Sequence, residues 1–515
     1  MLMNPSPYPR STRWLVSVPA LFLLVFLAIP TAVIVQRGAS VGAFADIFAN
    51  DGFRKVAWFT LWQTTLSTVL TVAFALPVTF ILARFSFIGK RLLLALITAP
   101  FLLPTVVVGS ALFALLPDRM HYTAFAIIVA HIFFNMAVVV RLVMPRWSQI
   151  DPELIHAAHT LGASTARTFR TITFPLIRPA LGFASTAVAL FCFTSFGAVR
   201  ILGGPAYSTL ETEIYVRSVQ LGDLNGAVAI GIIQAIFLIG MLSALTKFGR
   251  HHTSPLTVNI QVPKPTGSAQ KIAVTGIAIT TGFLALLPLI AVAWKSTSGW
   301  SQVLSSDTLR SLTVSARFAI TAAIIATTLG TLIALAIAYT STSSRLLETI
   351  TSLPLMISAV TVGLGMLITF DQSPFEFRST WWITPVAHSL IAIPLVVRTV
   401  LPVAQAIPQD LRDAAATLGS GVKDQWIRID LPLLRRCLAT ACALSAAVSL
   451  GEFGATSFLT RQTYETLPVS IARLLSRPGD TQHAKAFALS TLFFVFSIGA
   501  VYLAETVRAT RTKNH

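Results

Sequence analysis

The polar residues that could do chemistry in this chain are concentrated in two segments of an otherwise apolar sequence. The first covers residues 153–179 and reads ELIHAAHTLGASTARTFRTITFPLIRP, and the second covers residues 410–436 and reads DLRDAAATLGSGVKDQWIRIDLPLLRR. Neither segment, nor the rest of the sequence, shows the paired carboxylates, histidine clusters or nucleophile elbow that enzymes use. We therefore predict that the chain is not an enzyme and that the two segments make contacts.

Each polar segment is predicted to form a short helix that ends in a glycine turn. Apolar residues at i, i+3, i+4 and i+7 share one helix face, and both segments have this spacing: Leu154, Ala157, Ala158 and Leu161, then Leu411, Ala414, Ala415 and Leu418. Gly162 and Gly419 follow where a helix end favours a left-handed residue. A second short helix is expected next, before the following membrane span. We call these segments, with their flanks, the first elbow (151–179) and the second elbow (408–436).

Two elbows of this kind indicate docking onto a symmetric pair of partner proteins. Their small side chains would let another surface approach closely. The alternative, which fits a single elbow equally well, is that each merely packs on its own helix bundle.

The sequence contains no G-x-x-x-x-G-K-[ST] loop, the motif that binds the phosphates of ATP. The nearest segment, FIGKR at 87–91, lacks both the upstream glycine and the Ser or Thr that follows the lysine. We therefore expect this chain to bind no cofactor. If the protein uses the energy of ATP, then ATP and Mg²⁺ must be bound by partner subunits.

The elements that carry the elbows are expected to lie in lipid. Of 515 residues, 54% are hydrophobic and only 11% are charged, whereas soluble domains carry about 25% charged residues. The net charge of +18 does not indicate nucleic-acid binding, because the basic residues are scattered between apolar runs.

The three cysteines form no metal-ligand spacing. The repeated histidines His131 and His388 are expected to hydrogen-bond across helices and not to bind metal.

Twelve apolar stretches are long enough to cross a membrane, because about 20 helical residues span roughly 30 Å of hydrocarbon. They are 14–35, 56–83, 92–116, 122–144, 179–202 and 226–247 in the first half, and 272–294, 312–340, 346–370, 381–405, 437–459 and 484–505 in the second. The chain is therefore predicted to be an all-α integral membrane protein. Lysine and arginine accumulate on cytoplasmic loops, and their distribution here places both termini and both elbows in the cytoplasm.

The two halves of the chain are copies of each other. Adding 257 carries His131 to His388, Thr160-Leu161-Gly162 to Thr417-Leu418-Gly419, and Phe196-Gly197-Ala198 to Phe453-Gly454-Ala455. We expect a first half at 1–248, a polar cytoplasmic linker at 249–271 and a second half at 272–515. Six spans per half is an even number, so the halves form a parallel repeat about an axis along the membrane normal. Such a repeat predicts a cleft on that axis.

Both elbows resemble the EAA loop in the permeases of importer-type ATP-binding-cassette (ABC) transporters, which runs roughly EAA, three residues, Gly, nine residues and an apolar-Leu-Pro element. The matching letters are HAAHTLG with FPLIRP in the first elbow and DAAATLG with LPLLRR in the second. His156 and Asp413 replace the leading glutamate, while the alanine pair and the glycine are intact in both. The resemblance covers essentially the whole chain.

This resemblance implies a type I ABC importer permease fold of about 12 transmembrane helices, in a multi-pass protein of the bacterial cell membrane. It implies two ATPase subunits on the cytoplasmic side, an extracytoplasmic substrate-binding protein, and no nucleic-acid partner. The residues expected to contact the ATPase subunits are Glu153, Ala157, Ala158 and Gly162 in the first elbow and Asp413, Ala414, Ala415 and Gly419 in the second. An ion-coupled secondary transporter, also built from two six-helix repeats, is the alternative class and needs no cytoplasmic elbows.

The substrate is left open between thiamine and iron(III). TLETEIY at 209–215 and LGEFGATSFLTRQTYETLP at 450–468 resemble thiamine permeases most, but iron(III) permeases share much of this pattern. The segments 209–215 and 466–471 are expected to form short helices on the outer side. Ionisable residues inside a membrane mark substrate pathways, and Glu452 is the most unusual of them here. We predict that Glu452 and its repeat counterpart Ser195 line the translocation path, where a carboxylate would suit thiamine or another cation.

Overall fold

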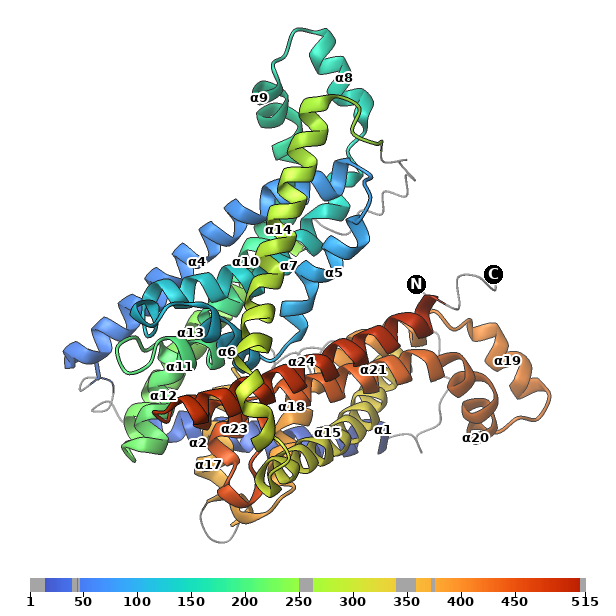
Figure 1. The fold of residues 1–515 in the computed structure, drawn as a ribbon. Helices are drawn as coiled ribbons and strands as arrows, with labels where there is room; N and C mark the ends of the chain where they lie inside the picture. Colours follow the sequence, from blue (N-terminus) through green and yellow to red (C-terminus); the bar gives the residue numbers. More distant parts are fainter. Residues whose placement is uncertain are drawn as a thin grey trace.

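The structure, a computed structural model, describes residues 14–38, 44, 47–249, 263–339, 358–371 and 376–509. Every regular element in these ranges is a helix (Figure 1), which confirms the predicted all-α class. Among the described residues, nine helices are long and apolar enough to cross a membrane, and the bent pair α5–α6 would make a tenth span. Most of the predicted linker and the first part of the predicted span 346–370 lie outside the described residues.

The first half alternates long helices with short ones. In chain order its α-helices are α1 (Trp14–Leu23), α2 (Ile29–Gly38), α4 (Asp51–Arg84), α5 (Lys90–Leu102), α6 (Thr105–Leu115), α7 (Ala124–Ser148), α8 (Pro152–Thr160), α9 (Thr165–Thr168), α10 (Phe174–Phe193), α11 (Gly197–Leu202), α12 (Leu210–Tyr215) and α13 (Leu224–Gly249). Polar side chains cap the N-termini of several of these helices. Asn50 Oδ1 accepts the backbone N–H of Gly52 and Phe53 at the start of α4, and Thr123 Oγ1 accepts that of Ala126 at the start of α7. These caps satisfy donors that a helix start leaves unpaired.

The described residues of the second half repeat this order from α6 onward, with α17 in the place of α6. The α-helices of the second half are α14 (Ser268–Lys295), α15 (Ser306–Tyr339), α17 (Ala359–Phe370), α18 (Ile383–Gln405), α19 (Gln409–Thr417), α20 (Val422–Gln425), α21 (Leu431–Gly451), α22 (Gly454–Leu459), α23 (Leu467–Leu475) and α24 (Asp480–Ala509). The repeat extends to packing. A Cβ on Gly109 in α6 would lie 3.6 Å from the Cα of Ala198 in α11, and one on Gly363 in α17 would lie 2.8 Å from the Cα of Ala455 in α22. The duplication seen in the sequence is therefore also a structural one.

Three predicted spans are interrupted and not continuous. Within 92–116, α5 and α6 meet at a bend of 106°, since Leu103 precedes Pro104 and is extended. The predicted span 179–202 breaks between α10 and α11, and 437–459 breaks between α21 and α22. Hydropathy could not locate these breaks, because averaging over a span length hides two or three residues of non-helical backbone.

The second short helix predicted in each elbow is not separate from the span that follows it. α9 continues through a π-helical turn, Phe169–Thr173, into α10, and α20 continues through Trp426–Asp430 into α21. In the first elbow the N–H of Phe174 bonds to the carbonyl of Phe169, which is the i→i−5 pattern of a π-turn. The next residue, Pro175, has no N–H to donate. The helix therefore passes through this proline without a break.

The halves are interlocked through their first spans. α1 packs on α15 and α2 packs on α17, both in the second half, while α14 packs on α5 and α6 of the first half. Figure 1 shows α14 running along the first half toward the first elbow. One apolar core consequently runs through both halves, with Leu27, Val106, Ile333 and Leu364 among its buried members.

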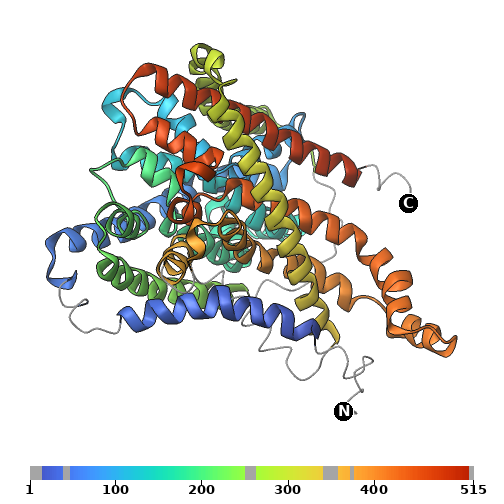
Figure 2. The ribbon, with the colours of Figure 1, turned by 90° about the horizontal axis from the view of Figure 1, so that it is seen from below.

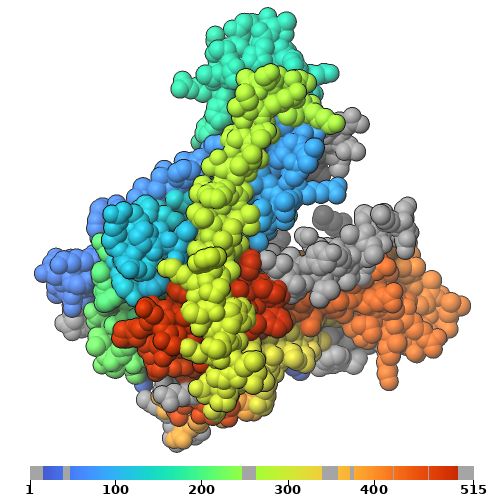
Figure 3. Space-filling model, in the orientation of Figure 1, coloured from blue at the N-terminus to red at the C-terminus, as the bar shows by residue number. Residues whose placement is uncertain are grey.

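The two elbows project from different arms of the molecule. Figure 1 shows α8–α9 at the tip of one arm and α19–α20 at the tip of the other, and Figure 3 shows both tips standing out from the surface. The view from below shows the second elbow, in orange, projecting from one side of the molecule and α1 and α2, in blue, along one edge (Figure 2). The arms meet around α6 and α17, which contact α23 and α12 of the opposite half.

Candidate functional sites

The glycine turns predicted in the elbows are present. Gly162 has a φ of +81° and Gly419 has a φ of +82°, which confirms the left-handed conformation. In the first elbow the N–H of Ala163 bonds to the carbonyl of Ala158 at 3.0 Å, and the equivalent bond in the second elbow is 2.9 Å long. This pattern is a Schellman motif, which satisfies the carbonyl groups at a helix end. It fixes the alanine pair in the last turn of each short helix.

The predicted apolar stripe is exposed on both elbows. Leu161 is 89% exposed and Leu418 is 88% exposed. α8 has no buried residue, and in α19 only Arg412 is buried. Glu153 and Asp413 also face solvent. The alanines of the stripe are exposed (Ala157, Ala414) or half-buried (Ala158, Ala415). Each elbow therefore presents an uncovered apolar knob, whose docking role stays a prediction.

The two elbows differ in what holds them together. In the second elbow, Arg412 on α19 pairs with Asp430, with Nη2 at 2.6 Å and Nε at 3.1 Å from the same carboxylate oxygen, Oδ1. Both side chains are buried. Ile155 and Thr173 occupy the equivalent positions in the first elbow and cannot form an ion pair.

A cavity lies where the interrupted helices of both halves meet, and its volume is about 160 Å³. The first half contributes Thr105, Thr194, Phe196, Gly197 and Glu211 to its wall, and the second contributes Ala359, Val360, Gly451, Glu452, Phe453 and Gly454. Non-helical backbone at membrane depth is tolerated where protein encloses it or where it lines a cavity. Discontinuous helices also build substrate sites in transporters. This cavity is therefore the candidate translocation site.

Glu452 lies on the cavity wall, and its carboxylate also begins α22. Its Oε1 accepts the N–H of Ala455 at 2.9 Å, and its Oε2 accepts the N–H and the hydroxyl of Thr456 at 3.0 and 2.7 Å. His388 Nε2 lies 3.3 Å from Oε2. Ser195 is buried in the α10–α11 break, but its neighbours line the cavity in its place. A role of either residue in translocation stays a prediction.

A second carboxylate on the cavity wall, Glu211, is one that the sequence pattern does not single out. Glu211 on α12 is 1% exposed. Its Oε1 accepts a hydrogen bond from Nε2 of Gln234 on α13, while Oε2 has no hydrogen-bond partner among the described residues. The sequence TLETEIY at 209–215 is typical of a polar segment on the outer side, so it does not indicate that Glu211 is buried. The available signal is that Glu211 and Glu213 lie about 200° apart around a helix, so that one of them faces inward.

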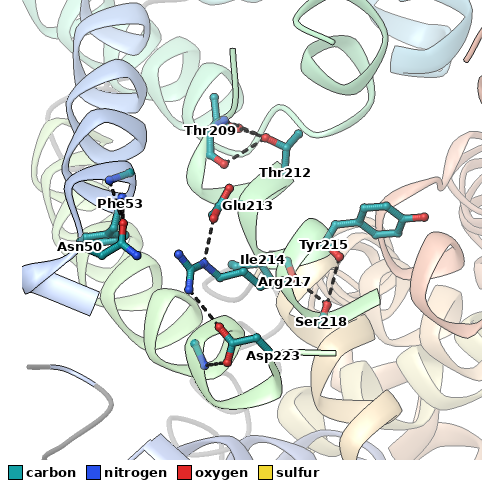
Figure 4. Close-up of polar contacts among 12 residues, drawn as sticks. Asn50, Phe53, Thr209, Thr212, Glu213, Ile214, Tyr215, Arg217, Ser218 and Asp223 are labelled. Atoms are coloured by element: carbon teal, nitrogen blue, oxygen red, sulfur yellow. Dashed lines mark hydrogen bonds and ion pairs between the residues drawn. The ribbon is translucent and has the colours of Figure 1, made fainter. Parts of the chain in front are cut away.

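The neighbouring carboxylate, Glu213, is held away from the cavity. Figure 4 shows Glu213, Arg217 and Asp223 joined in a row. Arg217 Nε lies 2.8 Å from Glu213 Oε1, and Arg217 Nη1 lies 2.9 Å from Asp223 Oδ2. Only one of the two glutamates of α12 therefore belongs to the cavity wall.

An aromatic pair forms another wall of the cavity. Phe196 and Phe453 are equivalent in the repeat and stack on each other, with ring centroids 5.1 Å apart and planes 27° apart. Because equivalent residues can touch only near the axis that relates them, this pair marks the repeat axis. Gly197 follows Phe196, and a Cβ there would clash with Oγ1 of Thr105. The close approach of α6 and α11 thus requires a glycine at this position.

The repeated histidines hydrogen-bond between helices, as predicted. His131 Nδ1 on α7 lies 3.1 Å from Ser67 Oγ on α4. His388 on α18 lies 2.7 Å from the hydroxyl oxygens of both Ser449 on α21 and Thr456 on α22. In the described part of the chain, no group of three or more His, Cys, Asp or Glu side chains is placed to hold a metal ion.

Comparison with protein families decides which class this architecture belongs to. The family described as "binding-protein-dependent transport system inner membrane component" matches residues 75–250 and again residues 326–508. It therefore matches more than half of the chain and occurs once in each half. The chain belongs to this family. This permease is a multi-pass inner-membrane component of an ABC importer, with two family domains fused in one polypeptide, and the predicted type I fold is confirmed.

Curated relatives match this permease along most of its length. The thiamine transport system permease protein ThiP of Brucella suis biovar 1 is 29% identical over 486 residues, which cover 89% of this chain and 88% of the relative. ThiP of Haemophilus influenzae is 26% identical over 468 residues, covering 83% and 86%. ThiP of Escherichia coli K12 is 24% identical over 525 residues, covering 95% and 97%.

Proposed function

We propose that this permease carries thiamine, or a closely related organic cation, across the inner membrane as the pathway-forming subunit of an ABC importer. The observation that carries the proposal is the cavity between the halves, whose wall holds one buried carboxylate from each half, Glu211 and Glu452. Desolvated carboxylates favour a positively charged ligand, and thiamine carries a permanent positive charge. The substrate named for the relatives supports the same class.

The energy comes from two separate ATPase subunits, each docked to one elbow on the cytoplasmic side. The elbows offer equivalent exposed knobs, Leu161 and Leu418, above turns fixed by Gly162 and Gly419. ATP and Mg²⁺ bind to those subunits, and the permease itself binds no cofactor and catalyses no reaction. When ATP draws the ATPase subunits together, the elbows move with them and rock one half against the other.

In this arrangement the termini and the linker are cytoplasmic, and a substrate-loaded binding protein docks on the outer side, near α12 and α23. Both short helices are tied to long ones in the same way. The N–H of Leu210 donates to Thr60 Oγ1 of α4 at 3.0 Å, and the N–H of Leu467 donates to Ser315 Oγ of α15 at 2.8 Å. Motion of the long helices therefore reaches α12, which carries Glu211.

The test is uptake by the assembled transporter. The permease is co-purified with its ATPase partner and reconstituted in liposomes, with ATP on the ATPase side and radiolabelled thiamine on its binding protein opposite. We expect ATP-dependent accumulation of thiamine and two ATPase copies per permease. Accumulation of iron(III) in place of thiamine would move the substrate assignment to the alternative. Uptake driven by an ion gradient without ATPase subunits would support a secondary transporter.

A further inference from the structure

Glu211 and Glu452 share one cavity although the sequence repeat does not relate them. The repeat counterpart of Glu452 is Ser195, and that of Glu211 is Pro468. Each half therefore contributes its carboxylate from a different element, α12 in the first half and the α21–α22 break in the second. The cavity consequently has acidic groups on two walls that duplication alone would not place there.

The two carboxylates differ in how their oxygen atoms are satisfied. Glu452 accepts hydrogen bonds from Ala455 and Thr456, so its oxygens are engaged in capping α22. Glu211 accepts a hydrogen bond from Gln234 through Oε1 and lies near the Ser358 hydroxyl, whereas no donor in the described part of the chain is within ordinary hydrogen-bond geometry of Oε2. A buried carboxylate oxygen without a donor is unfavourable. Glu211 is therefore the group that has capacity left for a ligand.

Aromatic faces complete the wall of the cavity. Phe196 and Phe453 stack on the repeat axis and line the same space. Tyr215, one turn beyond Glu211 on α12, packs against Phe196 with ring centroids 5.5 Å apart. Aromatic faces attract organic cations through the ring quadrupole. A planar, charged heterocycle would use both the carboxylates and the rings, whereas a hydrated metal ion would use only the carboxylates.

We infer that Glu211 and Glu452 bind the positively charged ring of the substrate in this cavity, with Glu211 making the direct ionic contact and Phe196–Phe453 packing on the ring. The inference rests on the proposed function, since it takes the substrate to be an organic cation such as thiamine. The cavity of about 160 Å³ is smaller than the roughly 300–1,000 Å³ of sites that enclose a drug-sized ligand. It therefore fits the charged ring and not the entire molecule.

The test compares Glu211→Gln with Glu213→Gln in the complete transporter, with its ATPase subunits and binding protein, in liposomes. Glu213 is a matched control because it lies on the same helix, pairs with Arg217 and is absent from the cavity wall. We expect Glu211→Gln to lower ATP-dependent thiamine uptake by about tenfold or more. Glu213→Gln should change it by less than about twofold, because the amide oxygen can still accept a hydrogen bond from Arg217 and Arg217 keeps its ion pair with Asp223. Glu211→Asp, which keeps the charge, should recover part of the uptake.

Equal thiamine uptake by the two glutamine variants would overturn the inference and leave the proposed function intact. A wild-type transporter that takes up no thiamine would overturn the proposed function itself. A second measurement needs no variant. Dicyclohexylcarbodiimide modifies buried carboxyl groups, and peptide mass spectrometry locates the label. Thiamine should protect Glu211 of the wild-type transporter, and labelling of Glu211 that saturating thiamine leaves unchanged would also overturn the inference.

Discussion

The carboxylate of Glu452 stands between two helices that an uninterrupted span would have merged. α21 ends at Gly451, and the N–H groups at the start of α22 need acceptors, which Glu452 supplies from within the break. A glutamate in an apolar run does not by itself identify a ligand site, because helix capping can use much of its hydrogen-bonding capacity. At this position the same side chain also lines a cavity, so both roles have to be measured.

We predict that Glu452→Gln weakens both roles. The amide replaces one acceptor oxygen with an NH₂ group near the donors of Ala455 or Thr456, which should destabilise the start of α22 by about 1–2 kcal/mol. The lost charge should also slow thiamine uptake without dissociating the complex. Ser457→Ala is the control, since the Ser457 hydroxyl bonds to the Phe453 carbonyl of its own turn. Thermal unfolding and thiamine uptake are measured on the same variant. Wild-type values of both would show that Glu452 neither stabilises α22 nor acts in the translocation path.

At the scale of helices and turns, backbone conformation shapes the elbows more than packing does. Nothing lies within 4 Å of a Cβ built on Gly162 or on Gly419. A substitution there meets no neighbour, so its effect comes from the left-handed backbone, which costs an L-residue about 1–2 kcal/mol. The leucine at the apex of each turn depends on that backbone for its position.

Replacing Gly162 and Gly419 together with valine should therefore displace Leu161 and Leu418 and weaken ATPase docking. A loss of about 1.4 kcal/mol corresponds to a tenfold loss of affinity, so the dissociation constant of the ATPase subunits for the purified permease should rise by about that factor. Gly421→Val is the control, because Gly421 also has open space around it but no positive φ. Normal ATPase binding by the double variant would show that the elbows are not the docking sites.

The second elbow should be more sensitive than the first to the loss of one charge. Asp430→Asn removes the carboxylate that faces the buried guanidinium of Arg412, and breaking a buried ion pair costs about 3–5 kcal/mol. Hydrogen exchange should rise in α19–α20. Exchange in α8–α9 should stay unchanged and serves as an internal control, since Ile155 and Thr173 stand at the equivalent positions. An unchanged second elbow would show that this ion pair does not hold it together.

At the scale of the whole molecule, the two halves are copies in sequence but are packed as one unit. The first span of each half lies on the helices of the other, and the largest apolar core draws residues from both. Burial between helices in lipid gains mainly from close packing and hydrogen bonding, because lipid already covers apolar surface. Separating the halves would therefore remove specific contacts of α5, α6, α15 and α17.

Expressed alone, residues 1–248 or 272–515 should be recovered poorly, whereas the two fragments expressed together should assemble. Each fragment can still insert its spans, so the loss is expected in assembly and protease resistance and not in membrane insertion. Co-purification of a tagged fragment with its untagged partner measures this, with the intact chain as reference. Two fragments that are each as protease-resistant as the intact chain would show that the interlock is not needed for stability.

The sequence by itself determined the features that depend on neighbouring residues. The scarcity of charge required a lipid environment, and the shift of 257 residues revealed the duplicated halves. The apolar stripe followed by a glycine placed left-handed turns at Gly162 and Gly419, where the structure has them. Hydropathy, periodicity and backbone preference act over a few residues, so a single sequence carries them in full.

Only the tertiary structure decided where the helices break, which first span packs on which half, and that Glu211 faces the same cavity as Glu452. These features depend on contacts between residues far apart in the chain. In the sequence Glu211 is indistinguishable from Glu213, until folding buries one and pairs the other with Arg217. Two carboxylates from different halves share a cavity only because the halves have packed around each other. No local sequence pattern encodes the position of one half relative to the other.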